Sequence, residues 1–148
     1  MRKGRGFADS IGGRLNIMEV SVKNKLQEHG KGVDEGRVIC EITAQEDMLN
    51  GAGYVHGGCL MYLIDNCALL CLTVLDKDAR LGMPGLSLAI DTVFHAPAGE
   101  GDRLRILATT MAIGSRIKSA RVEIWDLKRS RLVASGVEIK MDAPKPKM

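Results

Sequence analysis

The stretch from Cys59 to Leu75 constrains the fold most, because it carries only one carboxylate, Asp65, in an otherwise apolar run. Its length and composition predict a long apolar helix over roughly residues 57–75. Burying an unpaired carboxylate is costly, so Asp65 needs either polar partners that serve structure alone or a chemical task. The chain around it must show which of the two applies.

Segments on both sides of this helix alternate between apolar and polar residues with a period of two, as half-buried strands do. The alternation runs through residues 18–22, 38–43, 86–94, 104–108, 120–125 and 137–141. Turn residues separate these segments, for example Gly114-Ser115-Arg116. One helix among meandering strands predicts an α+β fold in which an antiparallel β-sheet covers one long α-helix.

A length of 148 residues fits a single domain. Residues 1–13 hold four glycines, so we expect a flexible N-terminal tail or a short helix there. We expect residues 14–148 to form the domain.

The composition argues against several classes of function. A net charge of +3 and an aromatic content of 3% do not suit a nucleic-acid-binding surface. The four cysteines form no CxxC pair and the three histidines are scattered, so we expect buried free thiols and no metal site. Neither a secretory signal nor a charge-free membrane span is recognisable. We therefore expect a reducing, cytoplasmic location; a mitochondrial location stays open.

Gly57 and Gly58 stand at the N-terminus of the predicted helix, where backbone N–H groups lack intrahelical acceptors and the helix dipole is positive. This suits a phosphate or the oxyanion of an acyl transfer, although an ordinary tight turn explains two glycines as well. Asp65 lies about 12 Å further along the axis, at about 1.5 Å per residue. One chain therefore cannot place both groups on one carbonyl, and if they cooperate the aspartate comes from a second subunit.

Several motifs resemble those of the hotdog-fold acyl-coenzyme A thioesterases, most closely the branch of the phenylacetyl-coenzyme A thioesterases and thioesterase superfamily member 2. They are Asn50-x-x-Gly53-x-x-His56-Gly57-Gly58, Leu63-x-Asp65-Asn66, Gly36-Arg37-Val38-Ile39-Cys40-Glu41 and Gly85-Leu86-Ser87. The similarity covers roughly residues 36–141. It implies a hotdog fold and a homodimer with shared active sites that pairs again to a homotetramer. It also implies hydrolysis of medium-chain, long-chain or aryl acyl-coenzyme A esters, a reaction of fatty acid metabolism.

The resemblance assigns roles to five residues. Asn50 and the Gly57 N–H would polarise the thioester carbonyl. Asp65 of the neighbouring subunit would activate a water molecule as general base, with help from Ser87. His56 would support the loop rather than act as a base. Without the resemblance, Ser87 has the pattern of an ordinary sheet hydroxyl.

A loop and a hairpin correspond to the family's coenzyme-binding segments. The substrate-binding residues implied in this way are Gly58, Phe94, His95, Ala96, Pro97, Gly114, Ser115 and Arg116. The hairpin has fewer lysines than in better-known members, and Arg116 and Lys118 are the residues that could contact phosphates. Coenzyme A is part of the substrate, so no cofactor is expected.

Three other functions stay open from the residues alone. A hotdog hydratase or dehydratase would use a histidine with an acid, and His56 with Asp65 could form such a pair. A non-catalytic acyl-coenzyme A binding protein would share the fold. Cys59, near the helix N-terminus, could also act as a nucleophile. No motif specifies the length or aromatic character of the acyl group.

Overall fold

A computed structural model describes residues 6–25, 32–75 and 85–142 of the chain. The four-residue helix α1 (Asp9–Gly12) precedes the strands β1 (Asn16–Lys25) and β2 (Val33–Thr43). A short 3-10 helix, η1 (Glu46–Met48), leads to the 19-residue helix α2 (Gly57–Leu75). The remaining strands are β3 (Leu86–Phe94), β4 (Arg103–Ile113), β5 (Ile117–Asp126) and β6 (Arg131–Met141).

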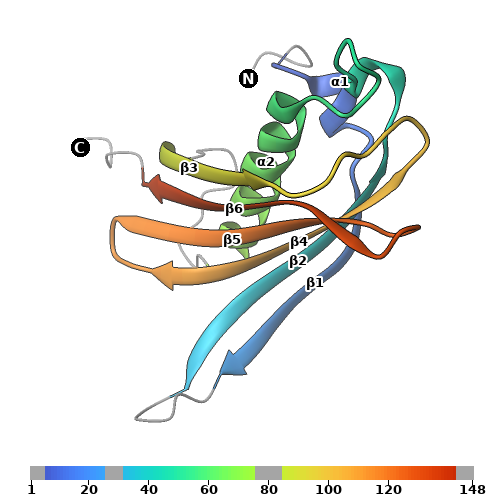
Figure 1. Cartoon of the computed structure of the whole chain (residues 1–148). Coiled ribbons are helices and arrows are strands. Elements are labelled where there is room, and N and C mark those ends of the chain that lie inside the picture. The colour runs from blue at the N-terminus through green and yellow to red at the C-terminus, as the bar shows by residue number, and fades with distance from the viewer. Residues whose placement is uncertain (1–5, 26–31, 76–84, 143–148) are drawn as a thin grey trace.

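These strands form one antiparallel sheet in the order β1-β2-β4-β5-β6-β3, and α2 lies against one of its faces (Figure 1). The α+β architecture predicted from the sequence is confirmed. The predicted bounds of the long helix, residues 57–75, agree with the structure. The charged run Asp76-Lys77-Asp78, which follows the predicted helix in the sequence, lies outside the described ranges. The division between residues 1–13 and 14–148 stays a prediction.

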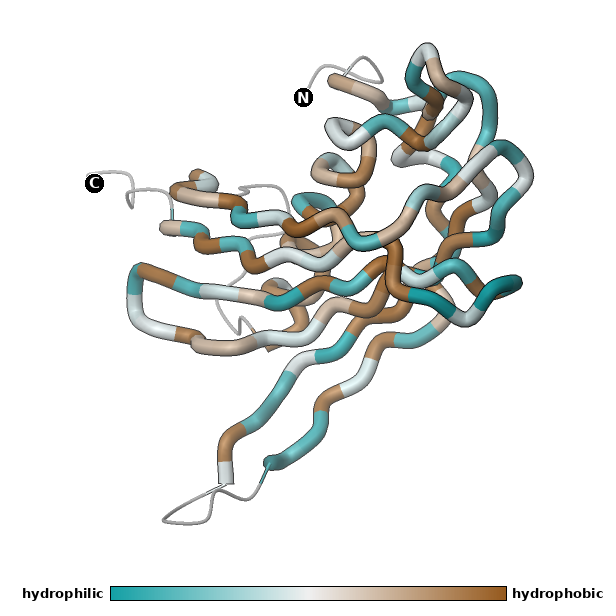
Figure 2. The backbone as a smooth tube through the Cα atoms, in the orientation of Figure 1, coloured by the Kyte–Doolittle hydropathy of each residue, from teal (hydrophilic) through white to brown (hydrophobic). Residues whose placement is uncertain are grey.

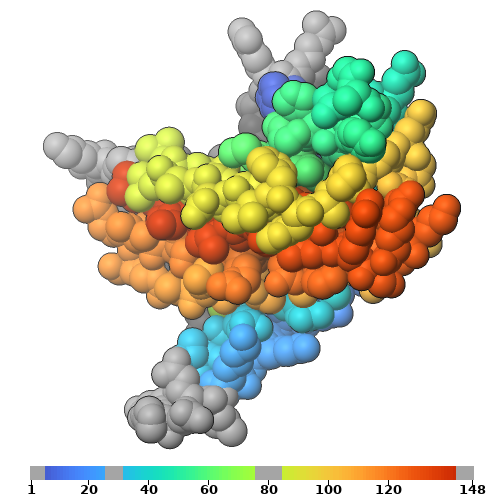
Figure 3. Space-filling model, in the orientation of Figure 1, coloured from blue at the N-terminus to red at the C-terminus, as the bar shows by residue number. Residues whose placement is uncertain are grey.

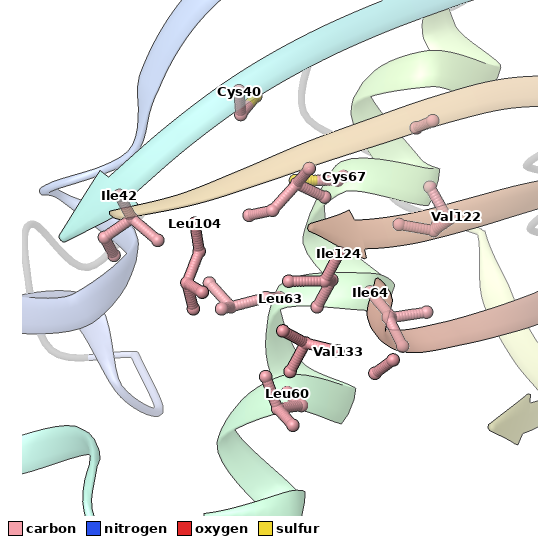
Figure 4. Close-up of a cluster of buried hydrophobic side chains, with 14 of the residues drawn as sticks. Cys40, Ile42, Leu60, Leu63, Ile64, Cys67, Leu104, Val122, Ile124 and Val133 are labelled. Atoms are coloured by element: carbon pink, nitrogen blue, oxygen red, sulfur yellow. The ribbon is translucent and has the colours of Figure 1, made fainter. Parts of the chain in front are cut away.

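The core lies between α2 and the central strands. Alternate residues of β2, β4 and β5 are buried. Hydropathy alternates along the same strands in Figure 2, because the apolar residues face the core. From the helix, Leu60, Leu63, Ile64 and Cys67 pack among the strand side chains labelled in Figure 4. Full burial of one such aliphatic side chain contributes roughly 1.5–3 kcal/mol. This packing holds α2, and with it Asp65, in a fixed position over the sheet.

Helix α2 is long and apolar enough to cross a membrane by length and composition alone. The core helix of a globular domain passes the same test. Its residues Leu60, Leu63, Ile64, Cys67, Ala68, Cys71 and Leu72 are buried. In this structure α2 therefore serves as the core helix of the sheet.

The two edge strands are more exposed than the sequence pattern predicts. The alternation in β1 predicts one buried face, but Met18, Val20 and Val22 are each more than half exposed. The last part of β1 and the first part of β2 project beyond the rest of the sheet, so α2 does not cover them (Figure 1). At the other edge, β3 exposes Leu86 and Leu88 in the same way. Both edges thus present apolar side chains on the single chain.

Candidate active site

Four polar side chains meet where α2 crosses β6, and we call them the Asp65 cluster: Asp65 of α2, Ser87 of β3, and Glu138 and Lys140 of β6. The Lys140 ammonium lies 2.8 Å from Asp65 Oδ1 and 2.8 Å from Glu138 Oε1. It also donates to Ser87 Oγ at 2.7 Å, and Ser87 Oγ donates to Glu138 Oε1 at 2.8 Å. The structure thus brings Asp65 and Ser87, two of the predicted catalytic residues, into one hydrogen-bonded group.

Strand pairing and a glycine explain why the cluster forms. Ser87 lies directly opposite Lys140 in the β3–β6 ladder, and Glu138 shares the face of Lys140 because side chains two residues apart point the same way. A Cβ atom on Gly136 would lie only 3.2 Å from two Ile64 side-chain atoms. The absence of a side chain at Gly136 therefore lets α2 lie close to β6, within reach of Asp65.

The charges in the cluster keep Asp65 ionised. Partial burial acts to raise the pKa of Asp65, but hydrogen bonds with Glu138 and Lys140 outweigh burial and hold the pKa below its ordinary value. Burial acts to lower the pKa of Lys140, but the same two carboxyl groups overcome this effect and raise it. Asp65 is therefore a carboxylate at neutral pH, and 41% of its side chain is exposed. It can accept a proton from a water molecule.

Sequence reasoning missed Glu138 and Lys140. Both are charged residues in a strand where Val137 and Ile139 alternate with them, which suggests that the charged face points to water. Instead Glu138 is fully buried and Lys140 is 6% exposed. The sequence signal for this burial was a pair of small residues, Ala134 and Gly136. They lie on the same face of β6 as Glu138 and leave room for the helix.

The other predicted catalytic residues surround the N-terminus of α2. Asn50 Oδ1 accepts two backbone N–H groups of its own loop, at 2.9 and 3.2 Å, which leaves its NH2 group to donate. His56 Nδ1 accepts the Gly58 N–H at 2.9 Å, in keeping with a role in supporting the loop. The Gly57 N–H has no hydrogen-bond acceptor within the described part of the chain. It is thus available to donate to a ligand oxygen.

Residues 94–97, predicted to bind coenzyme A, comprise the last residue of β3 and the loop after it, and they lie beside this helix end. A Cβ atom on Gly57 would lie 3.2 Å from the Phe94 ring, so this ring packs directly on the glycine. The backbone N–H groups of His95 and Ala96 donate to one carbonyl of β6, at 2.8 and 3.2 Å. The Pro97 carbonyl accepts a hydrogen bond from a β6 arginine at 2.6 Å. The loop is thereby fixed next to Gly57.

The hairpin of Gly114, Ser115 and Arg116 lies at the opposite end of β3 and β6. Its Arg116 carbonyl accepts the N–H of Asp142, just beyond β6, at 2.9 Å. This is the end at which Ser87 and Lys140 pair. Because a strand rises about 3.3 Å per residue, the two ends of β3 are roughly 25 Å apart. A single chain therefore does not bring the two predicted coenzyme-binding segments together.

A cavity of about 470 Å³ opens beside the N-terminus of α2. Its apolar side chains come from Phe7, Ile11, Met48, Leu49 and Tyr62. The Phe7 and Tyr62 rings meet edge to face, with centroids 5.8 Å apart. His56 and Gly58, the residues on either side of Gly57, also line the cavity.

Cys59 lines the same cavity but is not activated. Burial raises the pKa of its thiol, and the negative charge of Asp47 raises it further. Since a thiolate is the nucleophilic form, this environment disfavours Cys59 as a nucleophile. Cys40, Cys67 and Cys71 are buried, and all four cysteines are free, as predicted. Across residues 6–25, 32–75 and 85–142, no three His, Cys, Asp or Glu side chains cluster as metal ligands would.

The chain is similar in sequence to known thioesterases. The family model described as thioesterase superfamily matches residues 52–133, more than half of the chain. Acyl-coenzyme A thioesterase 13 of Homo sapiens is 29% identical over 101 residues, which are 68% of this chain and 69% of that protein. The protein of the same name from Mus musculus is 27% identical over 100 residues, with the same shares.

Solved structures show the same fold. Thioesterase superfamily member 2 of zebra fish superposes with a TM-score of 0.76 at 20% identity, over 95% of this chain and 89% of that one. The PaaI protein of the E. coli phenylacetic acid degradation operon gives a TM-score of 0.69 at 22% identity, over 93% and 83%. The resemblance and the hotdog fold predicted from the sequence are confirmed. The chain belongs to the thioesterase superfamily and is a thioester hydrolase.

Proposed function

We propose that this protein hydrolyses acyl-coenzyme A esters to a free acid and coenzyme A. The observation that carries the proposal is the combination of an ionised, half-exposed Asp65 with a Gly57 N–H that has no acceptor among the described residues. The first is a base for water and the second is a donor for an oxyanion. Coenzyme A as the carrier is supported by relatives named acyl-coenzyme A thioesterase 13 and by a similar Streptococcus pneumoniae structure described with coenzyme A.

In the proposed reaction, Asp65 accepts a proton from a water molecule as the water oxygen attacks the thioester carbonyl carbon. Hydrogen bonds from the Gly57 N–H and the Asn50 NH2 group stabilise the negative charge on the carbonyl oxygen. The tetrahedral intermediate then collapses and its C–S bond breaks. The departing thiolate takes the proton from Asp65, which restores the carboxylate.

We further propose that two subunits share each site. Gly57 and Asp65 are about 12 Å apart along one helix, too far for both to act on one carbonyl group. In a two-fold dimer with antiparallel β3 strands, the Phe94 end of one strand would meet the Ser87 end of the other. That arrangement would place Gly57 of one chain opposite the Asp65 cluster of its partner.

The surface of β3 supports such a dimer. Figure 3 shows β3 running across one face of the molecule, with β6 beside it. Its side chains Leu86, Leu88, Val93 and Phe94 are each more than half exposed on the single chain. Exposed apolar side chains gathered on one strand are typical of an interface. Further pairing to a homotetramer stays a proposal from the resemblance.

The cavity beside Gly58, whose lining is mainly apolar but also includes Ser10 and Asp47, is the proposed site of the acyl group. Its volume of about 470 Å³ is within the range of small-ligand sites. Its walls carry both aliphatic and aromatic side chains, Ile11 and Leu49 as well as Phe7 and Tyr62. We therefore expect medium-chain, long-chain or arylacetyl esters to be better substrates than acetyl-coenzyme A.

A hydrolysis screen tests the proposal. Acyl-coenzyme A esters of increasing chain length, together with arylacetyl esters, are incubated with the protein while released thiol is measured. We expect turnover that is fastest on esters long enough to fill the cavity. Tight binding of these esters without turnover on any of them would favour the non-catalytic binding protein. Addition of water to an enoyl ester without thiol release would favour the hydratase.

A further inference from the structure

We infer that Glu138 carries a proton in the catalytically active form of the site and donates it in a hydrogen bond to Asp65, which positions the Asp65 carboxylate for catalysis. The inference rests on the proposed function of Asp65 as general base. Glu138 touches neither the substrate nor the attacking water in this account, so it is a positioning residue.

The two oxygens of Glu138 have different surroundings. Oε1 accepts hydrogen bonds from both Lys140 Nζ and Ser87 Oγ, each at 2.8 Å. Oε2 is buried and has no hydrogen-bond partner in the described residues. A negative charge shared by an oxygen that is shielded from water and receives no donor is strongly unfavourable.

A proton on Oε2 resolves this situation. It turns the unpartnered oxygen into a donor. The acceptor that the inference assigns to it is the Asp65 carboxyl group, which contacts the same Lys140 ammonium as Glu138, each at 2.8 Å. Oε1 then acts as the carbonyl oxygen that accepts from Ser87 and Lys140. Every polar atom of Glu138 is satisfied in this arrangement.

The charges facing Glu138 agree with a neutral acid. From α2 it faces Asp65, from β3 Ser87, and from its own strand Lys140. On β5, Lys118 lies opposite Lys140, and its ammonium pairs with Asp142. The single Lys140 charge balances Asp65 if Glu138 is protonated. Consistent with this, burial and the neighbouring Asp65 carboxyl raise the pKa of Glu138 to about 7.

Loss of this proton has a defined consequence. Above about pH 7, two negative carboxyl groups would compete for one ammonium group, and the hydrogen bond to Asp65 would become a repulsion. The Asp65 carboxylate would then lose one of the two donors that fix its orientation. We therefore expect kcat/KM of the wild-type protein to fall as the pH rises through about 7.

Two substitutions at Glu138 show whether catalysis needs its protonated or its ionised form. Glu138→Gln keeps a donor and an acceptor but cannot ionise, whereas Glu138→Met keeps only the length of the side chain. At about pH 6 we expect kcat/KM of the glutamine variant to stay within about 3-fold of wild type, and that of the methionine variant to fall at least about 10-fold. The glutamine variant should also lack the fall above pH 7. Equal losses in both variants at pH 6 would show that the carboxylate form is needed, and would overturn the inference.

A second measurement requires no activity. In protein labelled with carbon-13 at the glutamate carboxyl groups, one resonance should titrate near pH 7 and be missing from Glu138→Gln. If every glutamate carbon titrates near the ordinary value of 4.5, the inference is wrong whether or not the protein hydrolyses thioesters. Conversely, a protein that hydrolyses no ester contradicts the proposed function, while the carbon titration still decides the state of Glu138.

Discussion

Substitution of Lys140 by methionine should destabilise the protein by an amount that grows with pH. Lys140 is 6% exposed and contacts Asp65, Ser87 and Glu138, so its removal leaves two carboxyl groups without a cation. Removing one member of a buried ion pair typically costs about 3–5 kcal/mol. At low pH the loss in free energy of unfolding should be smaller, about 1–2 kcal/mol, because Glu138 is then neutral. The Asp65 side chain is 41% exposed, so water screens its charge.

The pH dependence follows from proton binding to Glu138. Its pKa in the folded protein, about 7, lies above the ordinary value of 4.5, so the folded state holds this proton more tightly than the unfolded state. Its contribution to the free energy of unfolding is therefore complete below pH 4.5 and declines until pH 7, by roughly 3 kcal/mol in total. Without Lys140 the pKa of Glu138 rises further, and the decline continues beyond pH 7. The difference between wild type and Lys140→Met should then grow by about 1.4 kcal/mol per pH unit above 7.

Urea unfolding followed by fluorescence of the single tryptophan, Trp125, measures this difference at several values between about pH 5.5 and pH 8.5. Protein concentration is held constant because the protein is proposed to be a dimer. In a Glu138→Gln background, adding Lys140→Met should lower the free energy of unfolding by an amount that no longer grows above pH 7. If Lys140→Met in the wild-type background lowers the free energy of unfolding by the same amount at every pH, Lys140 does not set the pKa of Glu138 in the way proposed.

Two further predictions concern the nucleophile and the shared site. Cys59→Ala should retain most of the hydrolytic activity, because water is the proposed nucleophile; an acyl adduct on Cys59 in a mass spectrum would contradict this. Asn50→Ala and Asp65→Asn chains, each nearly inactive alone, should regain about a quarter of wild-type activity when unfolded and refolded together. Random pairing makes about half of the dimers mixed, and each mixed dimer has one intact site. Proven mixed dimers without activity would place the whole site within one chain.

The long helix and most strands were predictable because their signals are local. The apolar run ending at Leu75 gave the helix, and the two-residue period gave the central strands, since both patterns follow from repeat geometry. The exposure of β1 was not predictable in this way. Whether a face such as that of Val20 and Val22 is covered depends on how far the helix reaches over the sheet, which is a property of the whole fold.

The candidate site was predictable only in part. Asp65 stood out because a carboxylate in an apolar helix is costly, and Ser87 was found through resemblance alone. Glu138 and Lys140 were missed because charged residues alternating with apolar ones usually face water. Their burial depends on the approach of α2 to Gly136 and on pairing with β3, which are contacts between distant parts of the chain.

The rate of thioester hydrolysis by Asp65→Asn tests whether Asp65 is the general base. Asparagine has nearly the same shape but cannot accept the proton of water, so kcat should fall by about 100-fold or more with little change in KM. Asp34→Asn is the matched control, because this carboxylate lies in the β1–β2 hairpin and, among the described residues, accepts a side-chain hydrogen bond only from the exposed Asn24; it should keep wild-type activity. A near wild-type kcat for Asp65→Asn, in a protein that folds normally, would contradict the assignment of Asp65 as the general base.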